Sequence, residues 1–218
     1  MDIVLHPDAP LWTQEALRLV RDASQFQWYA VTLLGLVMYV YSVEIEKRNW
    51  NVVLAGLAFW GVDWINEIVN GVWLHVTKYS ALWTTSGSTS YQIFVGLNLE
   101  IMFLFAISGV LFTKSLPPDR KMKILGIPNR WFLSFGFSCF AVFVEVLLNR
   151  TGYFGWTYSW WNWPNIVLII LFGYGTFFVA AFVVHDMRTR AAQLKTVGAI
   201  WGIVLTGVLV FGVILRWI

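Results

Sequence analysis

Six long runs of apolar residues divide the chain, and short segments that hold most of its charged residues separate them. A helix that crosses the apolar part of a bilayer needs about 20 such residues. We therefore predict an all-α, polytopic membrane helix bundle that forms a single domain over residues 1–218. The six predicted transmembrane spans are residues 26–43, 50–76, 91–113, 131–149, 165–185 and 194–217.

The segment 11–25 has a different pattern, because its apolar and charged residues would lie on opposite faces of a helix. Helices of this kind lie in the interface of a membrane, so we predict an N-terminal interfacial amphipathic helix. The start of the chain has acidic residues and no basic region, and is not expected to be a cleaved signal peptide. The apolar face would carry Trp12, Ala16, Leu19, Val20 and Ala23, and the polar face Glu15, Arg18, Arg21 and Asp22.

Composition supports a membrane protein and excludes a soluble enzyme. Hydrophobic residues make up 58% of the chain and charged residues 12%, against roughly 45–50% and about 25% in soluble domains. The chain contains no His-x-x-x-His, Cys-x-x-Cys, Walker or Gly-x-Gly-x-x-Gly motif, and Cys139 is its single cysteine. We therefore expect no metal site, no cofactor and no nucleic-acid partner.

The distribution of basic residues predicts the orientation of the bundle, since loops on the cytoplasmic side carry more Lys and Arg. Ten basic residues would lie at one end and five at the other, which places both termini on the non-cytoplasmic side. The first group is Lys47, Arg48, Lys114, Arg120, Lys121, Lys123, Arg130, Arg188, Arg190 and Lys195, and the second is Arg18, Arg21, Lys78, Arg150 and Arg216.

Aromatic residues gather in the two loops predicted on the non-cytoplasmic side. They are typical of a belt at the lipid headgroups. They also fit a lid over an apolar cavity, because the stretch 156–164 is unusually rich in tryptophan. The residues are Trp83, Tyr91, Tyr153, Trp156, Tyr158, Trp160, Trp161 and Trp163.

Carboxyl groups inside the predicted spans are the main candidates for chemistry, because each costs roughly 2.5–3.5 kcal/mol to insert. Asp63, Asn66, Glu67 and Asn70 recur with helical spacing and form one polar stripe. Three acids fall in the outer half of their spans and are expected to converge: Glu67, Glu100 and Glu145. Because no Lys or Arg lies as deep, we expect some of them to be protonated at pH 7. Hydrogen bonding between helices is the structural alternative.

The layout resembles that of the emopamil-binding-protein superfamily, whose members include a sterol double-bond isomerase. The resemblance covers residues 6–187 and rests on Asp63-Trp-Ile-Asn-Glu67, the approach to a third span that bears Glu100, Glu145 late in the fourth span, and an aromatic fifth span. It implies an alkene protonated by Glu67 or Glu100. The placing of Glu67 close to Asn66 and Trp64 is also similar to the small integral-membrane terpene cyclases.

The residues and the resemblance together predict a cofactor-independent isomerase or cyclase that acts on a sterol- or isoprenoid-like lipid. We expect the catalytic groups to be Glu67, Glu100, Asp63 and Glu145, with substrate bound by Asn66, Asn70, Trp60, Trp64, Trp73, Asn98, Trp156 and Tyr174.

Two alternatives stay open. One is a proton-coupled transporter or lipid-binding protein that uses the same acids. The other is a structural subunit, because the last span carries Gly198, Gly202, Gly207 and Gly212, a small-residue face that suits a homodimer or a larger complex. The expected partners are membrane lipids and a lipophilic small molecule.

Overall fold

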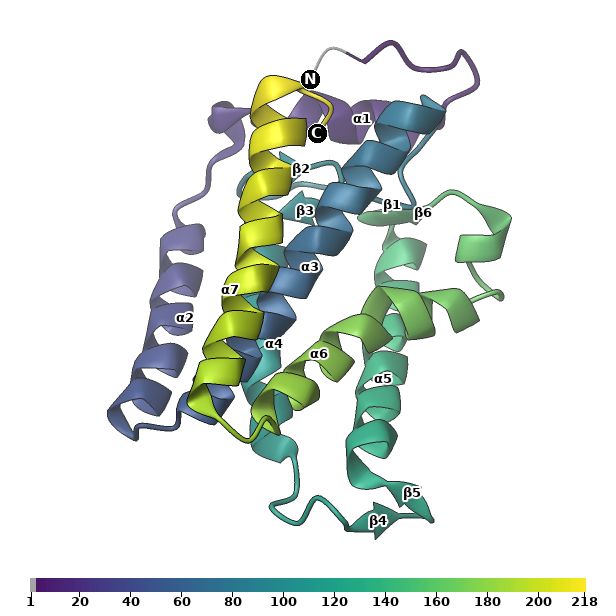
Figure 1. Ribbon diagram of the computed structural model, residues 1–218. Helices are drawn as coiled ribbons and strands as arrows, with labels where there is room; N and C mark the ends of the chain where they lie inside the picture. Colours follow the sequence, from purple (N-terminus) through teal and green to yellow (C-terminus); the bar gives the residue numbers. More distant parts are fainter. Residues whose placement is uncertain (1–2) are drawn as a thin grey trace.

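The computed structural model describes residues 3–218 and shows a bundle of long helices with a small cap of short strands beside the upper parts of two of them (Figure 1). The helices are α1 (Leu11–Leu19), α2 (Tyr29–Glu46), α3 (Trp50–Thr77), α4 (Leu99–Ser115), α5 (Asn129–Thr151), α6 (Gly175–His185) and α7 (Arg190–Gly207). Two π-helical segments, η3 (Ile169–Tyr174) and η4 (Val208–Ile214), continue α6 towards the cap and extend α7. Two short 3₁₀ turns are η1 (Ala23–Gln25) and η2 (Ser159–Trp161).

Four of the helices are long and apolar enough to cross a membrane: Tyr29–Glu46, Trp50–Thr77, Asn129–Thr151 and Arg190–Ile214. Each matches a predicted span to within a few residues. The stretch Ile169–His185 is shorter, and α4 has 17 residues. Length and composition therefore support four of the six predicted spans.

The third predicted span, residues 91–113, begins too early. Its first residues form a hairpin of β2 (Gln92–Phe94) and β3 (Leu97–Asn98), and α4 starts at Leu99. The Asn98 side chain ends the hairpin and caps the helix, because its Oδ1 accepts a hydrogen bond from Ile101 N at 2.9 Å.

The predicted interfacial helix is also shorter than expected. Helix α1 ends at Leu19, Arg21 has a positive φ of 61°, and Asp22 Oδ1 accepts a hydrogen bond from Ser24 N. These local interactions end the helix before residue 25. In Figure 1, α1 crosses the end of the bundle above the short strands.

The two long loops at this end pair with each other. Strand β1 (Trp83–Thr85), from the α3–α4 loop, runs antiparallel to β6 (Phe154–Trp156), from the α5–α6 loop, with Trp83 opposite Trp156. At the opposite end of the bundle, β4 (Lys123–Ile124) and β5 (Ile127–Pro128) form a second hairpin. The β1–β6 pair forms the lid of the cavity described below.

Helix α3 is the central element of the bundle and packs on α4, α6 and α7. Its contact with α4 is close because two glycines meet there: a Cβ on Gly109 would lie 3.1 Å from Gly56 Cα. The largest buried cluster is aromatic and lies between α3, α4, α5 and α6, with Phe59, Phe112, Phe177 and Phe178 among its members.

Candidate functional site

A cavity of about 310 Å³ lies inside the bundle, below the lid. Its walls come from α3, α4, α5, η3 and α6, and its upper end is covered by residues of β1, β6 and η2. Most of the lining side chains are aliphatic or aromatic, as is usual for sites that bind small molecules. The polar side chains that line it are Asp63, Glu67, Ser108, Glu145 and Tyr174.

The acidic residues of the cavity come from two helices. Asp63 and Glu67 are one turn apart on α3 and are buried, with exposed fractions of 2% and 4%. Glu145 of α5 and Tyr174 of η3 line the same cavity as these two acids. Three carboxyl groups thus share one apolar cavity, and no Lys, Arg or His in residues 3–218 lines it.

Several buried polar atoms at this site have no hydrogen-bond partner within the described part of the chain. They are two acceptors, Asp63 Oδ2 and Glu67 Oε2, and two donors, the indole nitrogens of Trp156 and Trp161. Buried polar groups are normally satisfied. Unpartnered acceptors and unpartnered donors therefore both lie in the wall of the cavity.

Glu67 is held in place by the lid. Its Oε1 accepts a hydrogen bond from Trp83 Nε1 at 2.9 Å. Trp83 also stacks on Trp161, with ring centroids 6.0 Å apart. It fits there because Gly96 has no side chain: a Cβ at Gly96 would lie 2.5 Å from Trp83 Cδ1. The lid thus supplies an indole ring and a fixed donor directly above the acids.

Asn70 and Asn66, from the polar stripe of α3, bind backbone. Asn70 Oδ1 accepts hydrogen bonds from Leu82 N and Trp83 N, and its Nδ2 donates to Trp83 O, so it anchors β1 to α3. Asn66 Nδ2 donates to the carbonyls of Phe172 and Gly173 in η3, at 3.4 and 3.2 Å. Both amides position elements that line the cavity, and neither is among its lining residues.

The structure does not bring Glu100 to the other acids. Its carboxylate accepts hydrogen bonds from the Tyr29 hydroxyl, Thr89 Oγ1, and the backbone and side chain of Ser90. Glu100 lies in the first turn of α4, where it joins the start of α2 to the loop before β2. The expected convergence of Glu67 with Glu100 is therefore wrong, and Glu145 is the acid that shares the cavity with Glu67.

The remaining residues predicted to bind substrate fall into two groups. Trp156 and Tyr174 line the cavity. Trp60 packs on Trp201 of α7, Trp64 packs on Phe94, Trp73 packs on Tyr158 and Trp160 at the lid end, and Asn98 caps α4.

The outer aromatic residues are similarly divided between the two roles that the sequence left open. Trp83, Trp156 and Trp161 line the cavity as a lid. Tyr153, Trp160 and Trp163 are exposed, as in an aromatic belt. Sequence reasoning grouped these rings but missed the roles of Trp83 and Trp161, because only the pairing of β1 with β6 shows which rings face inward.

The fold and the cavity define the class of this protein: a helical membrane protein with an acid-lined, aromatic cavity beneath a lid. The chain belongs to an uncharacterized membrane protein family, whose model matches residues 10–213.

Two proteins of Archaeoglobus fulgidus, both described as uncharacterized, are similar in sequence. One is 48% identical over 204 residues, which cover 94% of this chain and 97% of the relative. The other is a short protein, 44% identical over 55 residues, which are 25% of this chain and 98% of the relative. No solved structure matches. These comparisons do not show the emopamil-binding-protein superfamily or the terpene cyclases.

Proposed function

We propose that this protein is an integral-membrane enzyme that isomerises or cyclises a sterol- or isoprenoid-like lipid by acid/base chemistry, without a cofactor. The observation that carries the proposal is the meeting of Asp63, Glu67 and Glu145 with Tyr174 in one aromatic cavity. In this proposal α4 and the η3–α6 stretch cross the membrane beside the other four helices. The chain then has six spans and an interfacial α1.

The proposed reaction adds one proton to the substrate and removes one proton from it. Glu67 or Glu145, in its protonated form, donates a proton to one carbon of a C=C bond, and the adjacent carbon becomes a cation. The other carboxylate then takes a proton from a carbon next to the cation, which forms the C=C bond at a new position. In a cyclisation, a second C=C bond attacks the cation and forms a C–C bond before the proton leaves.

The surrounding residues have defined roles in this scheme. Trp83 donates a hydrogen bond to Glu67 Oε1 and orients that carboxyl group. In the proposed scheme the hydroxyl group of Tyr174, which lines the same cavity as Glu145, orients the carboxyl group of Glu145. Asp63 lies one turn from Glu67 and influences how readily Glu67 gives up its proton. The aromatic rings of Trp83, Trp161 and Phe105 offer their negative faces to the cation.

Deuterium incorporation tests the proposal even when the substrate is unidentified. Purified protein in liposomes that contain neutral membrane lipids is incubated in D₂O, and the extracted lipids are analysed by mass spectrometry. We expect one lipid class to gain deuterium, because the donated proton comes from solvent through the carboxyl group. Glu67→Gln and Glu145→Gln should each lower the rate by about 100-fold or more.

Two further variants make the result specific. Glu46→Gln changes an exposed acid at the end of α2 and should leave the rate unchanged. Glu100→Gln separates the acid pair expected from the sequence from the pair in the cavity: loss of turnover only in Glu100→Gln would contradict the proposed site. Binding or transport of a lipid with no deuterium gained in its bonds would favour a lipid-binding protein or a transporter.

A further inference from the structure

One wall of the cavity, between α4 and α5, differs from the others. On the α3 and α6 sides the cavity is closed by fully packed aromatic residues such as Phe59 and Phe177. On the α4 and α5 side, lining residues are also exposed on the outside of the molecule: Leu104 is 59% exposed and Phe140 is 65% exposed. Side chains that contact both the cavity and the exterior form the rim of a lateral opening.

The rim of this opening is apolar except for Ser108, and its residues lie in the middle of α4 and in the second half of α5. Helix α5 packs on η3 and α6 rather than closely on α4, and α5 is one of the four helices suited to cross a membrane. The opening therefore faces the hydrocarbon part of the bilayer. The residues that form the rim are Leu104, Ser108, Leu111, Phe140, Val144 and Leu148.

The size of the cavity limits how much of a lipid it can hold. At about 310 Å³ it lies at the small end of the range of roughly 300–1,000 Å³ found for small-molecule sites. A longer lipid would place one end inside the cavity and leave the rest of its chain in the opening. A lateral entrance fits such a ligand, because the chain never has to leave the bilayer.

The acidic residues that line the cavity restrict the kind of lipid headgroup that can bind there. Asp63, Glu67 and Glu145 line it without any basic residue from the described part of the chain. A phosphate or carboxylate headgroup would be buried beside acids without a cation to pair with, which is costly. An ammonium group could pair with the acids, but it has no lone pair to accept a hydrogen bond from the indole N–H groups of Trp156 and Trp161, which have no partner in the described part of the chain.

A hydroxyl group matches both kinds of free group in the cavity. It accepts a hydrogen bond from an indole N–H and donates one to a carboxyl oxygen. Asp63 Oδ2 and Glu67 Oε2 are the acceptors still available for it.

We propose that the gap between α4 and α5 is the lateral entrance for a neutral, hydroxyl-bearing lipid of isoprenoid type, whose hydroxyl end binds among the acids and the lid tryptophans. This inference rests on the proposed function, since it concerns the same cavity. It adds the route of entry and the chemical class of the headgroup, and binding can be measured without turnover.

Photo-crosslinking tests the class of headgroup. Three probes share one diazirine-bearing geranylgeranyl chain and end in an alcohol, a diphosphate or an amine. Each is added to the full-length protein in nanodiscs and irradiated, and the labelled peptides are mapped by mass spectrometry. We expect the alcohol to label the α4 and α5 peptides that carry the rim, and the diphosphate to label them about tenfold less. Stronger labelling by the amine than by the alcohol would show a cation site and would overturn the proposal. Equal labelling by all three probes, or labelling away from the rim, would overturn the proposal.

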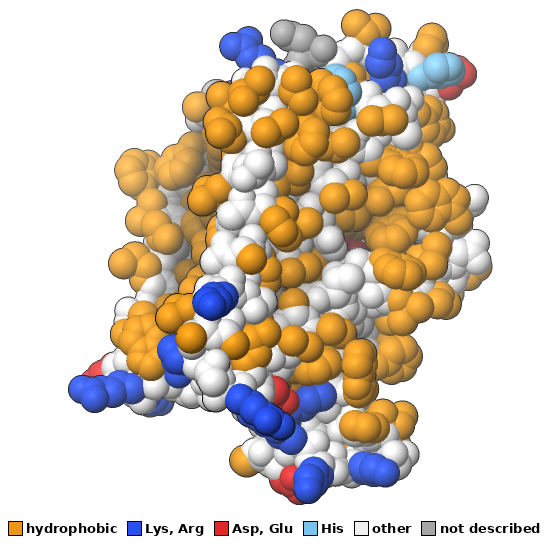
Figure 2. Space-filling model, in the orientation of Figure 1, with side chains coloured by type: hydrophobic (Ala, Val, Ile, Leu, Met, Phe, Trp, Pro, Cys, Tyr) orange, Lys and Arg blue, Asp and Glu red, His pale blue; other side chains and the backbone are white. Residues whose placement is uncertain are grey.

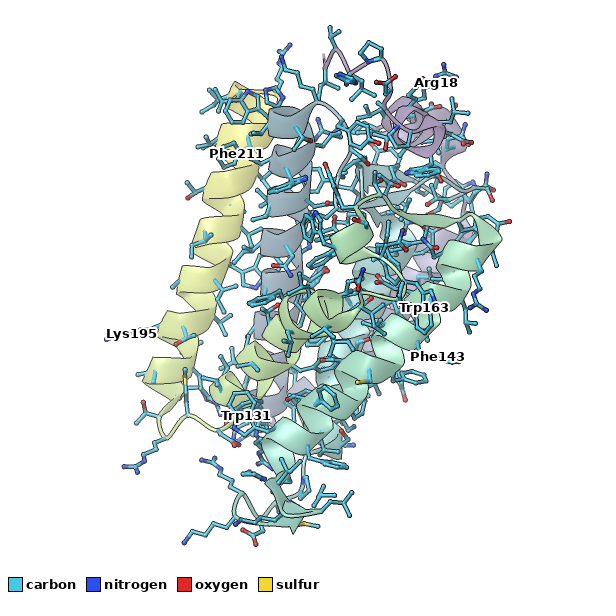
Figure 3. All side chains as sticks on the ribbon, turned by 90° about the vertical axis from the view of Figure 1, so that its right-hand side faces the viewer. Arg18, Trp131, Phe143, Trp163, Lys195 and Phe211 are labelled. Atoms are coloured by element: carbon cyan, nitrogen blue, oxygen red, sulfur yellow. The ribbon has the colours of Figure 1, made fainter. Side chains whose placement is uncertain are left out.

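Variants of the rim test the entrance. Val144→Trp and Leu104→Trp place a large ring in the opening and should lower labelling by the alcohol about tenfold or more. Their controls are Phe143→Trp and Leu36→Trp, at residues that are exposed but do not line the cavity; Figure 3 shows Phe143 on the outside of α5. The same loss in rim variants and controls would overturn the proposal.

The two proposals fail in different ways. Alcohol labelling at the rim without deuterium incorporation would refute the enzyme and keep the entrance. Deuterium incorporation at the normal rate in Val144→Trp and Leu104→Trp would refute the entrance and keep the enzyme.

Discussion

Some acidic residues of this protein pair with a basic side chain, and others do not. We use this difference to tell structural acids from candidates for catalysis. Glu44 is 1% exposed and pairs with Lys114, and Asp186 pairs with Arg130 at 2.9 Å. Asp63 and Glu67 are just as buried but have no cation beside them. Burial of a charge is normally accompanied by pairing. The unpaired acids are therefore the residues that packing alone does not explain.

The paired acid Asp186 leads to a prediction about stability and pH. Burial raises the pKa of Asp186, but hydrogen bonds from Arg130 and His185 and the charges of Arg130 and Arg120 outweigh it and hold the pKa below its usual value of 3.8. Because the pKa is lower in the folded state, the contribution to stability is complete above the unfolded-state value and is lost as the pH falls through the folded-state value.

We expect Asp186→Asn to lower the free energy of unfolding at pH 7 by about 2 kcal/mol, since it removes a charged partner of the largely buried Arg130. The loss should shrink as the pH is lowered below about 4. Thermal unfolding in detergent at pH 7 and at lower pH measures both effects. Glu46→Gln, at an exposed acid, is the control, and a loss that stayed the same at low pH would contradict this account.

Among the elements, the irregular ones build the site. The π-helical segment η3 carries Tyr174 to the cavity, and Asn66 holds it through the carbonyls of Phe172 and Gly173. Short π-helical turns are frequent at functional sites. Likewise, the lid consists of two strands of three residues each, which Asn70 ties to α3. The regular helices form the bundle, and the irregular segments η3, β1 and β6 bring side chains to its cavity.

The glycines of α7 lead to a prediction about the packing of this helix. A Cβ at Gly207 would lie 3.0 Å from Ile68 Cδ1, whereas nothing lies within 4 Å of a Cβ at Gly198 or Gly202. We expect Gly207→Leu to lower the free energy of unfolding by about 1–3 kcal/mol through overpacking, and Gly202→Leu to change it by less than about 0.5 kcal/mol.

Thermal unfolding compares the two glycine variants, and light scattering in detergent reports their oligomeric state. A change of oligomeric state in Gly202→Leu alone would show that the open glycine face of α7 contacts another copy of the chain. Equal destabilisation by both substitutions would contradict the packing described here.

At the scale of the whole molecule, two polar ends lie on either side of a hydrophobic middle. Lys and Arg side chains gather around the loops at the lower end in Figure 2, while α1 and the C-terminus lie at the other end (Figure 1). Figure 3 shows Lys195 towards the lower end of α7 and Phe211 towards the upper end of η4, which continues it. The two groups of basic residues defined in the sequence analysis therefore lie at opposite ends of the folded molecule.

This polarity predicts the topology. With Cys139 replaced by serine, we expect Met122→Cys, in the loop before β4, to react with a membrane-impermeant maleimide only after the membrane is permeabilised. Ser159→Cys, in η2 beside the lid, should react in intact cells. Both side chains are exposed. The reverse pattern of labelling would place the lid on the cytoplasmic side.

Much of the frame could be predicted from the chain alone, because long apolar segments have few options in a bilayer. The four helices suited to cross a membrane fall within a few residues of their predictions. The start of α4 was predicted too early, because apolar residues of the hairpin before it, such as Ile93, Phe94 and Val95, extend the apolar run of the helix. Glu145 was expected to converge with both Glu67 and Glu100, and the sequence could not show that only Glu67 shares its cavity.

The sequence by itself determined that this is a helical membrane protein with acids in its interior, since the length and composition of apolar runs are local properties. Only the tertiary structure decided which acids meet. Glu100 and Glu145 both fall in the outer half of their predicted spans, yet Glu100 is satisfied by Tyr29, Thr89 and Ser90, while Glu145 shares the cavity with Glu67. The rotation of each helix and the pairing of distant loops depend on contacts between segments far apart in the chain, and periodicity within one segment does not determine them.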